Sequence, residues 1–207
     1  LEYAAQGIST KGEVLYHVSN TSNVFDSGYH YYNSVRYMNS ACNKLYKRSF
    51  LIKNRLLFLE KIYIEDFEFN TRVLQKAKKL KATDLLVSQF LQSDNSITRT
   101  SDDAKKQKMV LDIIQVIKIT DTLYKNQTSN KDSSFFYLER LNFLVATLFY
   151  QLIKNKASYK EIQALKLKLQ ADAIFYVNHK IFDSRKNLLR IILLKNLWLY
   201  KGFKLLF

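Results

Sequence analysis

The chain has 207 residues, of which 33 are Lys or Arg and 18 are Asp or Glu, so its formal net charge is +15. It contains no proline and 47% of its residues are hydrophobic, which favours a folded, largely helical protein. Cys42 is the only cysteine, which excludes an intrachain disulfide or a thiolate metal cage and fits a reducing cytosol.

The basic excess has two readings. It indicates an anionic partner such as nucleic acid, a membrane surface or a phosphorylated ligand, or it reflects a Lys-, Asn-, Tyr-, Ile- and Phe-rich composition typical of AT-biased codons. No nucleic-acid-binding motif is present, so no nucleic-acid partner is predicted. The longest uncharged apolar run, residues 141–153, is shorter than the roughly 20 residues that span a bilayer. No signal peptide is visible. Because the chain starts at Leu1 and not at a methionine, we expect that sequence upstream is missing.

Residues 1–27 are predicted to be strand and loop, with a turn at 10–12 before a strand at Val14–Val18. A helix is predicted to begin at Gly28. Three further elements are predicted before residue 60: an extended segment at 41–46, a short helix at 49–54 and a strand at 56–58.

A longer helix is predicted over residues 65–80, because Phe69, Val73, Ala77 and Leu80 recur at helical spacing. A strand is predicted at 85–90 and a loop at 93–96.

After residue 100 the sequence becomes helical throughout. Asp102 and its neighbours are predicted to cap a helix that reaches about residue 126, and a second helix follows over 138–152. Ser158 and Glu161 form a capping box that opens a third helix, and Asp183 is predicted to cap a fourth that extends close to Phe207. The predicted fold is therefore mainly α with a few strands, divided into a mixed region 1–100 and an all-α region 101–207.

Glu65 and Asp66 are the strongest candidates for chemistry. Acidic residues in the first turn of a helix commonly complement the helix dipole, which is a structural role. Alternatively, one carboxylate acts as a general base, because the start of a helix after a strand is a rigid mounting point beside the open end of a sheet. The neighbouring sequence gives additional weight to the general-base alternative.

Several short motifs occur in order along residues 28–100. They are Asn43-Lys44-Leu45-Tyr46-Lys47-Arg48, Phe50-Leu51, Phe58, Glu65-Asp66, Lys76-Ala77-Lys78 and Asn95-Ser96-Ile97-Thr98. This ordered set resembles the C-terminal half of the catalytic domain of bacterial family 2 glycosyltransferases, which use nucleotide sugars and have the glycosyltransferase A fold. Residues 1–100 would then be the acceptor-side fragment of such an α/β domain, and 101–207 a helical extension.

The resemblance implies an inverting sugar transfer from a nucleotide-sugar donor to a saccharide or a lipid-linked saccharide. Asp66 matches the position of the family's catalytic aspartate, and Glu65 would shape the site or bind the acceptor. Lys44 would lie near the acceptor or the diphosphate, although a structural lysine is an equal alternative. Ser96 and Thr98 match an acceptor-side loop, for which turn formation is the alternative. Mg²⁺ or Mn²⁺ is expected in the full-length enzyme, held by ligands that this chain lacks.

Two departures from the family pattern matter. Leu91 and Ser93 stand where the family often has arginines, so a phosphate contact there is in doubt. The family's nucleotide-binding half and its Asp-x-Asp motif are absent, so we expect that about 100 upstream residues are missing. The chain alone is therefore not expected to turn over a nucleotide sugar. Such an enzyme would be cytoplasmic, at the inner face of the membrane if it is peripheral.

The last predicted helix supports an alternative. Residues 185–207 are basic and apolar and contain no acid, so they either lie in a membrane interface or pack against the other helices. The second hypothesis is accordingly a non-enzymatic, basic helical module that binds a membrane surface or a protein partner.

Overall fold

The computed structural model describes residues 1–19, 22–35, 39–92, 102–127 and 130–200. The chain divides into two compact units, which we call the N-terminal unit (Leu1–Lys105) and the C-terminal unit (Lys106–Phe207). Helices make up more than half of the chain and a small mixed sheet lies in the N-terminal unit, so the prediction of a mainly α fold with a few strands is confirmed. Ser96 and Thr98 lie outside the described residues.

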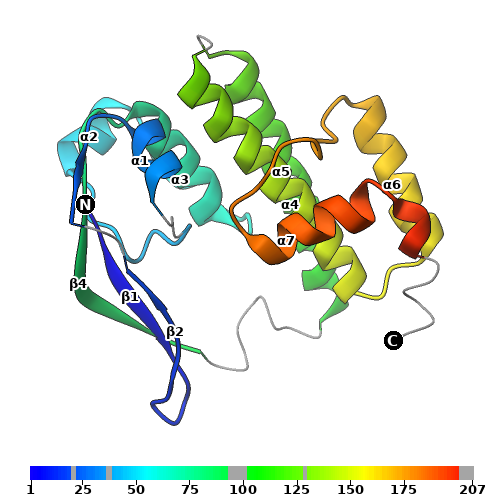
Figure 1. Ribbon diagram of the computed structural model, residues 1–207, viewed down its shortest axis with the longest axis horizontal. Helices are drawn as coiled ribbons and strands as arrows, with labels where there is room; N and C mark the ends of the chain where they lie inside the picture. Colours follow the sequence, from blue (N-terminus) through cyan, green and yellow to red (C-terminus); the bar gives the residue numbers. More distant parts are fainter. Residues whose placement is uncertain (20–21, 36–38, 93–101, 128–129, 201–207) are drawn as a thin grey trace. The chain divides into compact units, whose positions relative to one another are not determined.

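The sheet has four strands in the order β2-β1-β4-β3 (Figure 1). β1 (Glu2–Ile8) and β2 (Val14–Val18) form an antiparallel hairpin whose turn includes Gly12 at φ +82°, a conformation that glycine adopts without strain. The predicted strand at Val14–Val18 is confirmed. β1 also pairs in parallel with β4 (Leu80–Leu91), which brings residues about 80 positions apart in sequence together.

β4 begins inside the segment that was predicted to be helical. α3 (Glu65–Lys76) starts at the predicted residue but ends four residues early, because Ala77 takes an extended conformation and the chain enters the sheet at Leu80. On its other side β4 pairs with β3 (Val24–Phe25) only through Leu80 and Lys81. Most of this long strand therefore has an open edge among the described residues.

α1 (Gly28–Ser34) packs against α3 at very short range. A Cβ atom added to Gly28 would collide with the carbonyl oxygen of Leu74, and the Gly28 amide donates a hydrogen bond to the carbonyl oxygen of Ala77 at 3.0 Å. Glycine is required at this position because any side chain would force α1 away from the α3 backbone. The predicted start of this helix at Gly28 is confirmed.

α2 (Arg48–Lys53) corresponds to the predicted short helix, but the two extended segments around it are corrected. Residues 41–46 form turns with a single bridge between Glu2 and Lys44, and residues 56–58 form no strand. Leu56 is instead the buried anchor of an irregular segment that packs on Phe69 and Val73 of α3. Of the apolar run 56–58 only Leu56 is buried, while Leu57 and Phe58 are exposed, so the run predicted neither a strand nor the burial of all three side chains.

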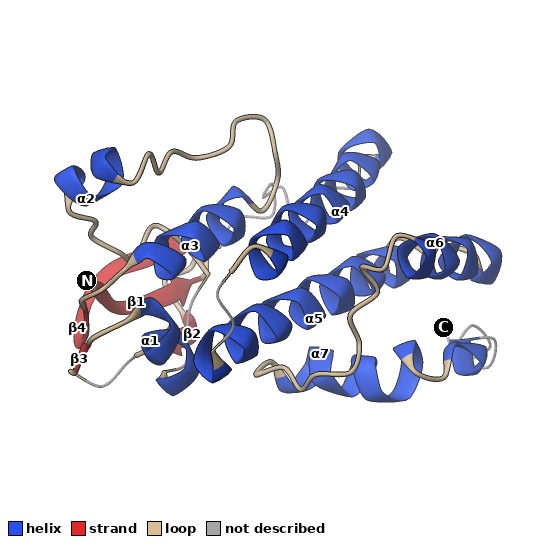
Figure 2. Cartoon of the chain, turned by 90° about the horizontal axis from the view of Figure 1, so that it is seen from above, coloured by secondary structure: helices blue, strands red, loops and turns tan. Residues whose placement is uncertain are grey.

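The C-terminal unit is helical throughout its regular structure. Its elements are α4 (Asp103–Lys125), α5 (Lys131–Lys154), α6 (Tyr159–Ala171), α7 (Ser184–Leu189), a π-helical turn (Arg190–Leu194) and a 3₁₀ turn (Leu197–Leu199). α4 and α5 lie side by side, joined by a short connection (Figures 1 and 2). Their facing apolar residues form a fully buried core that includes Ile113, Ile117, Phe136, Leu144 and Leu148.

Local capping signals were read correctly in this unit. The Asp102 carboxylate accepts a hydrogen bond from the amide of Ala104 at 2.9 Å, and Ser158 and Glu161 form both halves of the predicted capping box. Asp183 accepts a hydrogen bond from the amide of Lys186 at the start of α7.

The prediction that the helix capped by Asp183 continues close to Phe207 is wrong up to Tyr200, and residues 201–207 lie outside the described part of the chain. α7 has only six residues, after which the amide of Lys195 donates to the carbonyl oxygen of Arg190 in a π-type turn and Asn196 leaves the helical conformation. The Arg190 side chain is buried and donates to the carbonyl oxygen of Val177 and to the Asn187 side chain. These hydrogen bonds hold the turn at Arg190 against the chain at Val177. The spacing of apolar residues along the sequence does not predict them.

Candidate functional site

The candidate site is built on the first turn of α3. Ile64 precedes the helix at φ 59° and ψ 27°, the left-handed conformation, which costs about 1–2 kcal/mol for an L-residue and more for a β-branched one. Its carbonyl oxygen accepts the amide hydrogen of Phe67 at 3.0 Å. The strained turn therefore sets the direction in which Glu65 and Asp66 leave the backbone.

Glu68, the third acid of this turn, has a structural role. Its carboxylate is buried and receives two hydrogen bonds from the Arg72 guanidinium, at 2.6 and 2.7 Å. Arg72 also donates to the carbonyl oxygen of Leu57 at 2.6 Å, which fixes the loop that leads into α3. This pair was not predicted from the sequence, although a Glu and an Arg four residues apart on a helix are the expected signal.

Asp66 differs from Glu68 in that it has no hydrogen-bond or ion-pair partner among the described residues. Its side chain is partly buried, whereas Glu65 is exposed. The residues that follow, Phe67 and Phe69, are buried and anchor the turn. A carboxylate held at a helix N-terminus and not engaged by the protein is available to accept a proton.

Tyr46 and Asn70 connect this turn to the neighbouring loop, a role that was not predicted for either residue from the sequence. The Tyr46 hydroxyl donates to Asn70 Oδ1 at 2.6 Å, and its ring meets Phe69 edge-on at 5.4 Å. Burial, and then the negative charge of Asp66, raise the pKa of Tyr46. The phenol therefore stays protonated at neutral pH and remains a hydrogen-bond donor.

Lys44 lies on the same loop as Tyr46, with its side chain buried. Its ammonium group donates to the carbonyl oxygen of Ser40 at 2.6 Å and to Asn43 Oδ1 at 2.8 Å, and it lies 3.6 Å from a carboxylate oxygen of Glu2. The protein itself thus engages this ammonium on several sides. That environment fits the structural alternative for Lys44 at least as well as acceptor binding.

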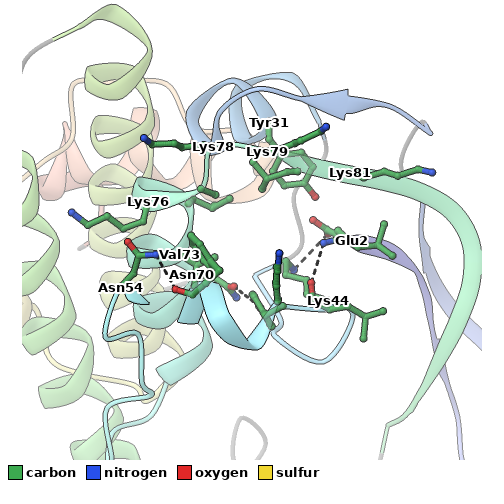
Figure 3. A pocket seen from close by; sticks show the side chains of 18 of the residues that line it. Glu2, Tyr31, Lys44, Asn54, Asn70, Val73, Lys76, Lys78, Lys79 and Lys81 are labelled. Carbon is green, nitrogen blue, oxygen red and sulfur yellow. Dashed lines mark hydrogen bonds and ion pairs between the residues drawn. The ribbon is translucent and has the colours of Figure 1, made fainter. Parts of the chain in front are cut away.

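A cavity of about 490 Å³ opens between the Lys44–Lys47 loop, α2, the second half of α3 and the start of β4 (Figure 3). Six exposed lysines surround it, which we call the lysine rim: Lys47, Lys53, Lys76, Lys78, Lys79 and Lys81. Glu2, Tyr46 and Lys44 also line the cavity, but Asp66 does not. The structure therefore brings Lys44 and Tyr46 to the cavity and leaves the predicted base outside its lining.

The described residues include no group of three or more His, Cys, Asp or Glu side chains that could hold a metal ion. Glu65 and Asp66 alone do not form a site for Mg²⁺ or Mn²⁺. Within the same described ranges, no helix has the length and apolarity needed to cross a membrane.

Comparison with known proteins gives no assignment. No family model matches the chain, and no curated protein and no solved structure is significantly similar to it. The function must therefore be argued from the residues themselves.

Proposed function

We propose that the chain is the acceptor-side part of an inverting glycosyltransferase in which Asp66 is the general base. The observation that carries this proposal is the contrast within one helical turn: Glu68 is buried in an ion pair, while Asp66 has no hydrogen-bond or ion-pair partner among the described residues. An acid that only stabilises the helix dipole needs neither the strained turn at Ile64 nor partial burial of its side chain.

In the proposed step, Asp66 accepts the proton of an acceptor hydroxyl while that oxygen attacks the anomeric carbon of the donor sugar. The new carbon–oxygen bond forms as the bond to the nucleoside diphosphate breaks, and the diphosphate leaves with the electron pair. Attack from the opposite face inverts the anomeric configuration. Glu65, exposed beside the base, would contact the acceptor.

The exposed faces of the sheet support the proposal that further structure completes the catalytic domain. Leu85 and Val87 on one face of β4 are 67% and 62% exposed, and Leu86 on the other face is 44% exposed. In β2, Leu15 is 55% exposed. A sheet that is apolar on both faces is expected to be covered on both faces. The proposed cover is the nucleotide-binding half, which would also supply the Mg²⁺ or Mn²⁺ ligands.

The remaining parts of the proposal follow from the resemblance of residues 28–100 to family 2 glycosyltransferases. The donor is a nucleotide sugar and the acceptor is a saccharide or a lipid-linked saccharide. The proposed location is the cytoplasm, at the inner face of the membrane for a lipid-linked acceptor. Ser96 and Thr98 remain candidates for acceptor contacts.

The test replaces Asp66 with Asn in a protein that includes the nucleotide-binding half. Loss of a general base costs about 10²–10⁴-fold in rate, so turnover should fall at least a hundredfold while donor affinity stays within twofold. Glu65→Gln is the matched control, since it removes a neighbouring charge from the same turn, and we expect a much smaller loss. Turnover of Asp66→Asn at the wild-type rate would refute the assignment.

The membrane-binding alternative is favoured by one specific observation. In the segment from α7 to the 3₁₀ turn, Leu194 and Leu197 are buried, whereas Leu188, Ile191 and Trp198 are 57%, 45% and 67% exposed. A basic segment with exposed apolar side chains and a tryptophan suits an anionic membrane interface.

Flotation with vesicles that contain phosphatidylglycerol tests this alternative. Replacing Leu188, Ile191 and Trp198 with Ser should abolish flotation, and replacing Leu111 and Leu167, which are equally exposed on α4 and α6, should not. Equal flotation of both variants would exclude the C-terminal segment as a membrane contact.

A further inference from the structure

We infer that the cavity bounded by the lysine rim binds a small organic ligand that carries two or more phosphate charges. The inference concerns a site separate from the proposed base. Lys76 is ten residues beyond Asp66 on α3, which places it about 15 Å further along the helix. The cavity lining includes the second half of that helix and none of its first-turn acids.

The charge of the cavity is not balanced by the protein. No lysine of the rim has a carboxylate partner among the described residues. Glu2 is the single acid in the lining as far as the structure describes the chain, and it already lies against Lys44. The C-terminus of α3 contributes only about half a negative charge. Six positive charges therefore surround a concave surface with almost no compensation, which is unfavourable unless an anion binds there.

The arrangement of the lysines favours a multiply charged ligand. Figure 3 shows Lys76 and Lys78 extending to one side of the cavity and Lys81 to the other, so the positive charges are spread around it. Lysine is a flexible point charge that commonly binds phosphate. Several lysines spread around one opening can contact different phosphate oxygens of the same ligand.

The walls of the cavity suit the organic part of such a ligand. Phe50, Val73 and Leu74 contribute apolar surface, and Tyr46 and Asn54 add polar groups to the same lining. A volume of about 490 Å³ is typical of small-molecule sites. The expected ligand carries a diphosphate or a comparable phosphate group. Either a soluble metabolite or a lipid headgroup can supply that group.

The test uses the 207-residue chain and two phosphate probes. Inorganic pyrophosphate is titrated by calorimetry at low and moderate salt, and vesicles of phosphatidylcholine with phosphatidic acid are used for flotation. The test variant replaces Lys76, Lys78, Lys79 and Lys81 with Gln. These side chains are exposed, so the variant should keep its circular dichroism spectrum and melting temperature.

The matched control carries the same number of Lys→Gln changes on exposed positions of the C-terminal unit, namely Lys131, Lys160, Lys168 and Lys180. Both variants have the same net charge, so bulk electrostatic attraction is equal. We expect the rim variant to lose at least about tenfold in affinity for the probe that binds and the control to lose less than about twofold.

The two probes distinguish the source of the ligand. Pyrophosphate binding that the rim variant loses indicates a soluble phosphate ligand. Flotation that the rim variant loses, without pyrophosphate binding, indicates a lipid headgroup. Absence of both interactions in the unmodified chain, or equal losses in the rim and control variants, would overturn the inference. Because no step of the test involves sugar transfer, its outcome is independent of the role of Asp66.

Discussion

Replacing Arg72 with Met should destabilise the N-terminal unit strongly, because it leaves the Glu68 carboxylate buried without its partner. The Glu68 side chain is only 2% exposed and receives two short hydrogen bonds from Arg72. Breaking a buried ion pair by removing one partner costs about 3–5 kcal/mol. Arg72 is 19% exposed, so water can partly replace it, and we expect the lower end of that range.

Urea unfolding followed by circular dichroism measures the change in the free energy of unfolding. Hydrogen exchange of the α3 amides is needed as a local probe, because the only tryptophan, Trp198, lies in the C-terminal unit. Protection of those amides should fall by about two orders of magnitude for a loss of about 3 kcal/mol. Adding Glu68→Gln to Arg72→Met should restore part of the stability, since a neutral amide is easier to bury than an unpaired charge.

Lys105→Met is the control for this experiment. Lys105 and Asp102 form an ion pair at 4.0 Å in which both side chains are about half exposed, and such pairs contribute less than about 1 kcal/mol. A cost below about 1 kcal/mol for Arg72→Met, or a double variant no more stable than the single one, would refute the view that Glu68 is a buried charge held by Arg72.

Three further predictions concern the packing and titration of other elements. Gly28→Ala should lower the melting temperature of the N-terminal unit by several degrees in a thermal scan, because its methyl group would collide with the Leu74 carbonyl; an unchanged melting temperature would show that α1 can move at little cost. Ser158→Ala should lower the free energy of unfolding of the C-terminal unit by about 1 kcal/mol in urea, and Ser158→Gly by less, as expected for an N-cap. Burial, and then the charge of Arg190, lower the pKa of His179 in the folded state, so the unfolded chain binds more protons and stability should fall as the pH drops below about 6.5. Between neutral and mildly acidic pH, the melting temperature of His179→Phe should fall less than that of the wild type. A control substitution at the exposed His17 should lower the melting temperature over this range by as much as in the wild type.

Local signals in the sequence predicted the local structure well. The capping box at Ser158 and Glu161, the caps at Asp102 and Asp183, and the start of α3 at Glu65 all depend on contacts between residues close in sequence. Such contacts form wherever the backbone becomes helical, so their residue types are informative on their own.

Features that depend on distant residues were not predictable in this way. β1 contains Ala4 and Ala5, small residues with little strand preference, and it is a strand because it pairs with both β2 and β4. Leu56 is buried by packing on α3 and not by strand pairing. The path of the chain after α7 depends on the burial of Arg190, whose partners include a carbonyl oxygen thirteen residues earlier.

The two acids of the candidate site were predicted from the sequence, but the residues around them were not. The sequence indicated Glu65 and Asp66 through their position, and the spacing of Glu68 and Arg72 was the one sequence signal that Glu68 is engaged, but its burial became evident only from the fold. The lysine rim draws on two stretches of sequence, 47–53 and 76–81, so only the fold brings the lysines of the first stretch to those of the second.

The open edge of β4 has a practical consequence. Beyond Lys81 the outer side of this strand has no β-strand partner among the described residues, and Leu85, Val87 and Leu91 are exposed along it. Unpaired backbone amides and carbonyls beside apolar side chains are a template for intermolecular β-pairing. The isolated chain should therefore form oligomers at a rate that rises steeply with concentration, and a single Lys at position 87 should slow that growth without altering the fold.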